Sequence, residues 1–507
     1  MQLNNQVHKR QKLQIFQRIF FFRRKIYSIP LLSFMLVLSA CHNTSFAPND
    51  QRFSWKPTKR IKRPHKSTLF FPPNATQHAR ILQIYGGTYH DPKLEKLLAN
   101  ILRKLIVVSH NSHKNYSITI LNSGGVNAFA LPNGSIYITR GMLALANDSS
   151  EVAAILAHEL AHIIANHGIL RLQKKAQLKT ARHLSSHLLS HANRKLYNPI
   201  KDKQQLAQFS RNQELEADSI ALELLQQAGY DPFASPRFLK SMEAYNAFCN
   251  ISGITNASLD FLASHPTTPQ RIHLAIEKAR KIHTTNLQKS DHDFFLKNLD
   301  GMVFGGSLHT GFMRGNQFIH PQLGIAFSLP DNFTIEHSTN TLWASGPNNI
   351  AIRFDALLHP AEISASDYLQ SGWIVGLDQS SIRPFTMHGL PGARARASNE
   401  KWQFDVVVII FNHHIFRFLT AAPHHSSTFK AIAESTIQSF HPLSASQLQK
   451  LQPFKIRVVR VQKGDSVASL AKKMQNTMHK ERLFRILNAL SPTQTLPIGA
   501  NVKIIME

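Results

Sequence analysis

Residues 151–168 decide the fold of this chain, and they read EVAAILAHELAHIIANHG. The stretch leaves almost no polar face, which is typical of a helix that is buried on all sides. Asp148 or Ser149 can cap its N-terminus, Glu151 falls in the first turn, and Gly168 is placed to end the helix. The sequence therefore predicts one buried helix across this stretch.

Two histidines and a glutamate interrupt this apolar helix, and burying them without partners would be costly. His158 and His162 are four residues apart, so they project from one helix face and can chelate one cation. Glu159 stands beside them, where it can act on a metal-bound water. In a continuous helix His167 lies about 140° around from His162, so it is not expected to be the third ligand. The pattern indicates a metal site, although it also arises by chance in long chains.

The third ligand is expected from residues 211–218, which read RNQELEAD and lead into a second apolar helix. The metzincin spacing does not apply, because Ala165 and Gly168 stand where that class needs Gly and His. Glu214 and Asp218 share one helix face, so one can bind the metal while the other orients a ligating histidine. Ordinary carboxylates on a helix surface are the alternative.

A short sheet is expected before the metal-binding helix. A helical pattern begins at Asp91 and is followed by turn and strand signals. The strand-like runs are Ile118–Leu121, Val126–Leu131 and Ser135–Thr139. Tight turns between them predict a small antiparallel sheet. Asn127, Ala128 and Phe129 would form an edge strand that can hold an extended substrate peptide by main-chain pairing.

This order of motifs strongly resembles the gluzincin metallopeptidases of peptidase family forty-eight. That family includes the CAAX prenyl proteases, the HtpX heat-shock protease and a periplasmic outer-membrane assembly protease. The resemblance runs from about Thr88 to Lys289. Its motifs, in order, are Val126–Ala130 with Pro132–Gly134, Tyr137–Gly141, the His158 motif with His167-Gly168, Arg211–Asp218, Ala228–Tyr230, and Ser264–Pro269 followed by Arg271.

The resemblance implies a zinc metalloendopeptidase with one Zn²⁺ per chain. His158, His162 and Glu214 would be the zinc ligands, Glu159 the general base, and Asp218 a catalytic residue that supports a ligand from outside. The sequence shows no transmembrane span of the kind that the CAAX and HtpX branches carry. This difference argues against substrates held in a lipid cavity.

His265 is a further candidate of this site. Pro266 disfavours helical geometry at His265, so its imidazole is expected on a loop or at a helix start. By resemblance to the outer-membrane assembly protease, it would take the fourth zinc position and hold the enzyme inactive. It could instead donate a hydrogen bond to the oxyanion, or merely pack near the site. The sequence leaves these roles open.

The N-terminus has the pattern of a lipoprotein leader. Residues 1–28 carry seven basic and no acidic side chains, and the following apolar run of 12 residues is too short to span a bilayer. The run ends in Leu38-Ser39-Ala40-Cys41, which resembles the lipobox of bacterial lipoproteins. We expect a signal peptide at 1–40, a lipidated Cys41, and a basic, Pro-rich tether at 41–78. His42, the residue after Cys41, is not the Asp that is associated with retention in the inner membrane. The resemblance therefore favours the outer membrane.

Composition limits the partners. The net charge is +28, or +21 without the signal peptide, which favours anionic surfaces. The charge is spread along the chain and no nucleic-acid module is evident, so no nucleic-acid partner is expected. With Cys41 lipidated, Cys249 would be the single cysteine left in the mature chain, so no disulfide framework is expected.

Two further regions follow the expected peptidase domain at 79–290. Residues 312–442 alternate strand-like runs with two helical patterns, which predicts an α+β domain with a mostly antiparallel sheet and no evident chemistry of its own. Residues 454–507 read strand, helix, helix, strand and resemble a LysM module, which implies binding to N-acetylglucosamine polymers. Ser466-Val467 departs from the usual Thr-Leu, so a βααβ unit without a ligand is the alternative.

Together these features predict a multidomain protein: a mainly α zincin-type metallopeptidase domain with a small antiparallel sheet, then an α+β domain, then a βααβ LysM-like module. The expected function is cleavage of misfolded or misassembled proteins in the bacterial envelope. The expected location is the periplasm. The lipid on Cys41 would anchor the protein to the membrane, and the C-terminal module would bind peptidoglycan. The alternatives are a chaperone or assembly factor for outer-membrane proteins, and a wall-binding scaffold with little proteolysis.

Overall fold

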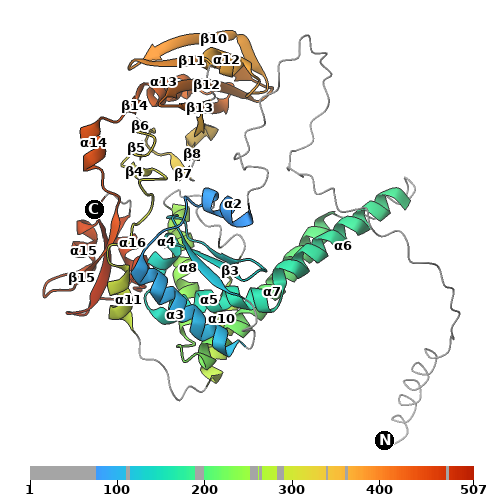
Figure 1. Ribbon diagram of the computed structural model, residues 1–507, viewed down its shortest axis with the longest axis vertical. Helices are drawn as coiled ribbons and strands as arrows, with labels where there is room; N and C mark the ends of the chain where they lie inside the picture. The colour runs from blue at the N-terminus through green and yellow to red at the C-terminus, as the bar shows by residue number, and fades with distance from the viewer. Residues whose placement is uncertain are drawn as a thin grey trace, which may run out of the picture. The chain divides into compact units, whose positions relative to one another are not determined.

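The computed structural model describes residues 76–109, 115–188, 199–251, 261, 265–282, 291–337, 341–359, 363–475 and 479–507 (Figure 1). The expected signal peptide at 1–40, Cys41 and nearly all of the expected tether at 41–78 lie outside these residues. Within them a helical region is followed by sheet-rich regions, which confirms the predicted multidomain order.

The helical region surrounds one central helix. Its helices are α2 (Gln77–Ile84), α3 (Pro92–Val108), α4 (Arg140–Leu145), α5 (Ser149–Ile164), α6 (His167–Leu188), α7 (Pro199–Gln227), α8 (Ala234–Ile251), α10 (Pro269–Lys281) and α11 (His292–Leu299). Helices α3, α7 and α8 pack against α5, whose Leu156, Ala157 and Leu160 are fully buried. Among the described helices none alone is long and apolar enough to cross a bilayer. Only α5 and the first part of α6 would together reach that length and composition, and they are bent by 51°.

The N-terminal end of α5 agrees with the prediction, and its C-terminal end does not. Asp148 caps the N-terminus, where its Oδ1 accepts the Glu151 N–H at 2.8 Å. The predicted stop at Gly168 is wrong. The helix ends before Asn166, which adopts a positive φ of 53°, and α6 begins at His167, so Gly168 lies inside the next helix. Asparagine enters the left-handed region more readily than most residues, so it can end a helix where glycine is expected.

A three-stranded sheet lies between α3 and α4 in sequence. Its strands are β1 (Ser117–Leu121), β2 (Ala128–Ala130) and β3 (Ser135–Thr139), in the order β1-β3-β2. The predicted antiparallel sheet is wrong in one pairing: β2 and β3 are antiparallel, but β1 and β3 are parallel. The link 122–127 carries the chain past β3, so β3 becomes the central strand. This link runs so close to α4 that a Cβ at Gly141 would lie 2.3 Å from the Gly124 carbonyl oxygen.

The second region is built on two sheets. Its strands are β4 (Phe312–Arg314), β5 (Gln317–His320), β6 (Ile325–Ser328), β7 (Thr334–His337), β8 (Thr341–Ser345), β9 (Ala351–Leu358), β10 (Leu377–Met387), β11 (Leu390–Ser398), β12 (Trp402–Phe411), β13 (His414–Pro423) and β14 (His441–Pro442). One sheet has the order β10-β11-β12-β13-β9-β8-β7 and the other β14-β6-β5-β4. In the described residues, neighbouring strands of these two sheets pair in antiparallel fashion, as predicted.

Two apolar clusters cover the two faces of the larger sheet. On β12, Val407 and Ile409 pack with the smaller sheet and with α13 (Phe429–Gln438), whereas Val406 and Val408 pack with α12 (Ala365–Gln370). Successive side chains of a strand point to opposite faces, so a run of four apolar residues indicates a strand buried on both sides.

The C-terminal unit has the expected order of elements: β15 (Lys455–Arg460), α15 (Val467–Lys473), α16 (Lys480–Leu487) and β16 (Asn501–Met506), with β15 and β16 antiparallel. It follows α14 (Ala445–Lys450). Its apolar side chains belong to the same buried cluster as those of α3, α5 and α8. Lys503 is fully buried and donates from Nζ to the carbonyl oxygens of Ala144 (2.8 Å) and Ala146 (2.7 Å), just before α5. This unit is therefore joined to the helical region by polar as well as apolar contacts.

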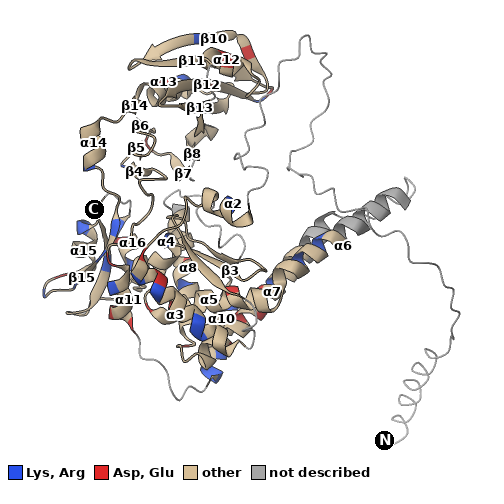
Figure 2. Ribbon diagram, viewed as in Figure 1, with Lys and Arg blue, Asp and Glu red and all other residues tan. Residues whose placement is uncertain are grey.

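Basic side chains are distributed over many elements. Lys and Arg occur on α3, α10, α15 and β15 (Figure 2). In the described residues the positive charge is therefore not gathered on one helix or strand.

Candidate metal centre

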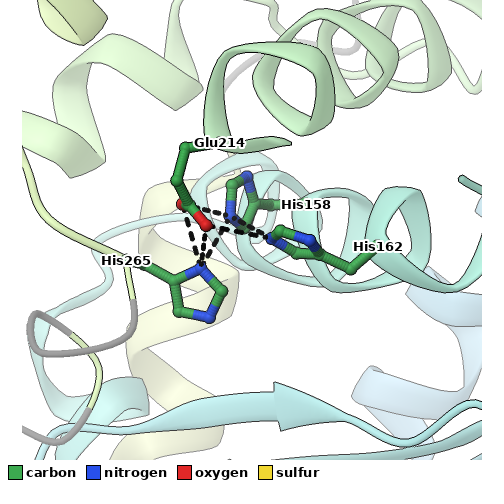
Figure 3. Close-up of side chains that lie close together, drawn as sticks. All are labelled: His158, His162, Glu214 and His265. Carbon is green, nitrogen blue, oxygen red and sulfur yellow. Dashed lines mark hydrogen bonds and ion pairs between the residues drawn. The ribbon is translucent and has the colours of Figure 1, made fainter. Parts of the chain in front are cut away.

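Four side chains from three elements converge beside α5 (Figure 3). His158 and His162 come from α5, Glu214 from α7, and His265 from the segment before α10. One donor atom from each lies within 4.8 Å of the others. Three of the four are buried and His162 is partly exposed, so the cluster has limited contact with solvent.

The separations between these donors suit a tetrahedral cation. Nε2 of His158 lies 3.1 Å from Nε2 of His162, 3.2 Å from Nδ1 of His265 and 3.4 Å from Oε2 of Glu214. The Glu214 oxygens lie 3.0 and 3.1 Å from Nδ1 of His265. Ligands about 2.0–2.1 Å from a tetrahedral Zn²⁺ are about 3.3 Å apart, so the donor set fits a divalent metal such as zinc.

Close packing of α5 and α7 brings the donors together. Ala217 and Ala221 on α7 are buried small residues, which allow the two helices to approach. The third segment is anchored by the His265 N–H, which donates to the carbonyl oxygen of Phe261 at 2.6 Å. The Phe261 ring lies 4.7 Å from the His265 ring, centroid to centroid. These contacts hold the imidazole in the cluster.

Asp218 lies outside the cluster and contacts Nδ1 of His158, the ring nitrogen that does not face the other donors. Its Oδ1 is 3.0 Å from Nδ1 of His158. Arg271 binds both Asp218 oxygens, with Nε–Oδ2 at 2.7 Å and Nη2–Oδ1 at 2.8 Å, and also donates to the Pro266 carbonyl oxygen at 2.9 Å. Arg271 thus ties α7 to the segment that carries His265. The sequence marked it only as the end of a motif.

Burial and hydrogen bonds together decide the direction in which the pKa values of these groups shift. Burial disfavours charge, but hydrogen bonds from His158 and His265 outweigh it and hold the pKa of Glu214 well below its ordinary value. Burial likewise opposes the charge of Asp218, yet Arg271 and His158 keep its pKa low. For His158 the bonds to Asp218 and Glu214 outweigh burial and raise its pKa to about 10. Burial lowers the pKa of His162.

Glu159 is buried next to the cluster. Only 1% of its surface is exposed, and its Oε1 has no hydrogen-bond partner among the described residues; Nε2 of His265 lies 3.8 Å away. Burial raises the pKa of its carboxyl group, although His265 and His158 oppose this. A buried carboxylate oxygen without a partner is suited to accept a proton from a bound water.

His167, which was not expected to be the third ligand, contacts His162 of the cluster. Its Nδ1 lies 2.8 Å from Nδ1 of His162, and its Nε2 lies 3.2 Å from Oε2 of Glu216. The prediction assumed a continuous helix, in which His167 would point elsewhere. The break at Asn166 returns His167 toward His162. The one available signal was Asn166, a residue that tolerates the left-handed conformation.

Strand β2 lies at one edge of the three-stranded sheet and packs against α5. It begins at Ala128, but Asn127 is already paired, since its carbonyl oxygen accepts the Thr139 N–H at 3.0 Å. Ala128 is buried, and the Phe129 ring stacks on Tyr137. These residues therefore lie on an edge strand of the three-stranded sheet, and their pairing with a substrate stays a prediction.

The chain matches known proteins over its helical region. Residues 92–279 match the model of peptidase family M48. A mitochondrial metalloendopeptidase OMA1 of Schizosaccharomyces pombe is 28% identical over 255 residues, which is 45% of this chain and 73% of the relative. A β-barrel assembly-enhancing protease of Yersinia pestis is 25% identical over 229 residues, 43% of this chain.

The OMA1 of Arabidopsis thaliana is 31% identical over 166 residues, 33% of this chain and 32% of the relative. The match covers 46% of the Yersinia protein, so this chain spans less than half of that relative. The matched residues carry α5, α7 and the four converging donors, in agreement with the predicted resemblance. Residues 92–279 therefore form a metallopeptidase domain of peptidase family M48.

Proposed function

We propose that this protein is a zinc-dependent metalloendopeptidase that holds one Zn²⁺ per chain through His158, His162 and Glu214. The observation that carries the proposal is the convergence of these donors, 3.1–3.6 Å apart, beside the buried carboxylate of Glu159. Two imidazoles and one carboxylate with an open fourth position are the ligand set of hydrolytic zinc enzymes.

Glu159 is the proposed general base. Zinc bound at this site would polarise the scissile carbonyl and lower the pKa of the attacking water. Glu159 accepts the proton of that water and returns it to the leaving amine. The pKa of its carboxyl group, raised by burial, suits a residue that must both take and give a proton. Asp218 acts through His158, whose ring it orients.

The proposed substrate is an extended polypeptide. Asn127, Ala128 and Phe129 would pair with it through their main-chain groups. The edge position of β2 and its packing against α5, the helix that carries His158 and His162, support this placement. Main-chain pairing selects for unfolded segments rather than for one side chain.

We assign His265 to the fourth position of the cluster. Its Nδ1 lies 3.2 Å from Nε2 of His158 and 3.0 Å from Oε2 of Glu214, which is the separation of two ligands of one ion. An imidazole there would exclude the attacking water, so the resting enzyme would be slow until the segment moves. The alternative role is a hydrogen bond from His265 to the oxyanion. It requires the imidazole to move away from the ligand atoms of His158, His162 and Glu214.

The proposed setting is the bacterial envelope. The predicted leader at 1–40, the predicted lipidation of Cys41 and the predicted outer-membrane location favour cleavage of misfolded or misassembled envelope proteins. Similarity to a β-barrel assembly-enhancing protease supports a second candidate function, assistance to outer-membrane assembly. The LysM-like order of the C-terminal unit supports contact with peptidoglycan.

Metal removal tests the proposal. The full chain should contain one zinc ion per chain, cleave denatured casein, lose cleavage on dialysis against a chelator, and regain it with stoichiometric Zn²⁺. Magnesium should not restore it, because two imidazoles disfavour that ion. Cleavage that survives complete removal of zinc would overturn the proposal.

A further inference from the structure

The two α5 histidines of the cluster are supported in different ways. A histidine that binds a metal through one nitrogen usually donates the other N–H to a neighbour, which fixes the ring and its tautomer. For His158 that neighbour is the carboxylate of Asp218, 3.0 Å from Nδ1. For His162 it is Nδ1 of His167, at 2.8 Å. His167 is therefore the neighbour that controls the second ligating ring.

The direction of each hydrogen bond follows from the role of His162. If its Nε2 faces the cation with a lone pair, its proton is on Nδ1 and is donated to His167. Nδ1 of His167 then accepts, which places the His167 proton on Nε2. That nitrogen lies 3.2 Å from Oε2 of Glu216, a carboxylate that only accepts. The three side chains thus form a chain of hydrogen bonds with one consistent set of protons.

Helix α7 holds His167 at two points. Gln213 donates from Nε2 to the main-chain oxygen of His167 at 3.0 Å, and Glu216 receives the ring proton. His167 itself is 3% exposed. Because Glu214 lies between these two residues in sequence, α7 supplies one donor of the cluster and positions another through His167.

We propose that His167 is a positioning residue that accepts the Nδ1 proton of His162 and is itself oriented by Glu216. The inference rests on the proposed function, since it requires His162 to bind zinc. The His167 contribution exceeds that of Glu216, because the Glu216 side chain is 61% exposed and water can replace it. Loss of such support weakens metal binding by roughly 10- to 100-fold.

Two substitutions at one position separate orientation from packing. In His167→Asn the amide oxygen occupies nearly the place of Nδ1 and still accepts from His162, whereas His167→Leu fills the space without an acceptor. Zinc affinity of the full chain is measured by competition with a chromogenic chelator. We expect His167→Leu to lose roughly 10- to 100-fold in affinity and His167→Asn to recover most of that loss.

Glu216→Ala provides a second test, and the fold should tolerate it because the Glu216 side chain is exposed. Its matched control is Glu223→Ala, which alters an exposed carboxylate of the same helix. A small loss of zinc affinity is expected for Glu216→Ala alone. Wild-type affinity in His167→Leu, or equal losses in His167→Leu and His167→Asn, would overturn the positioning role while leaving the zinc proposal intact. Failure of the wild type to bind zinc would overturn both.

Discussion

The carboxylate of Asp218 lies 3.0 Å from Nδ1 of His158, on the opposite side of the ring from the nitrogen that meets the other donors. Asp218 therefore supports a donor without entering the cluster, whereas Glu214 lies inside it.

This difference predicts an order of effects. Glu214→Ala should abolish stoichiometric zinc binding, because it removes a ligand, whereas Asp218→Ala should lower zinc affinity by roughly 10- to 100-fold. Chelator competition gives both values, with Glu223→Ala as the control on the same helix. If Asp218→Ala were the more damaging change, the ligand and its support would be reversed.

His265→Ala should raise the basal rate of peptide cleavage with zinc still bound. The substitution removes the imidazole that lies among the donors, so water can take the fourth position. Initial rates on a denatured protein are compared with those of His273→Ala, which alters an exposed histidine of α10. A lower rate with full zinc content would identify His265 as a donor to the oxyanion instead.

Zinc binding should release one proton from His158 at pH 8. Without a bound cation the pKa of His158 is raised to about 10, so its imidazole is charged at pH 8. Glu214 and His162 have lowered pKa values, so they have no proton to release at that pH. The raised pKa also stabilises the zinc-free fold below about pH 6.5, and that stabilisation is lost as the pH rises through about 10.

Proton release is measured by calorimetry of zinc binding in two buffers that differ in ionisation enthalpy. Asp218→Asn weakens the hydrogen bond that raises the His158 pKa, so it should release less than one proton at pH 8. Equal enthalpies in the two buffers for the wild type would contradict the assigned protonation.

Lys503→Met should destabilise the fold by about 1–3 kcal/mol, because it leaves the carbonyl groups of Ala144 and Ala146 without their buried donor. The free energy of unfolding in urea is compared with that of Lys463→Met, which alters an exposed lysine of the same unit. Equal stability of the two variants would show that the Lys503 hydrogen bonds contribute nothing to the free energy of unfolding.

Local patterns were sufficient for the features that depend on residues near in sequence. The spacing of His158 and His162 predicted one helix face, and the apolar composition predicted the burial of α5. Glu214 and Asp218 were both proposed from their shared face on α7, and the resemblance separated their roles. Each inference used the geometry of a single helix.

Features that depend on distant partners were missed. Arg271 contacts Asp218 across 53 residues, and Lys503 contacts Ala144 across 359, so no local pattern reports either contact. The parallel pairing of β1 and β3 arises because the link 122–127 places β2 on the other side of β3. Turn signals in the sequence do not specify that side. His167 was missed for a local reason, because Asn166 rather than Gly168 ends the helix.

The central claim is that Glu159 carries the proton in a zinc-dependent hydrolysis, and Glu159→Gln tests it most directly. The amide has nearly the shape of the carboxylate but cannot accept the proton, and Glu159 is none of the proposed ligands. We expect this variant to retain one zinc ion per chain and the unfolding temperature of the wild type, and to cleave denatured casein about 10²- to 10⁴-fold more slowly. A zinc-loaded Glu159→Gln protein that cleaves casein at the wild-type rate would contradict the account.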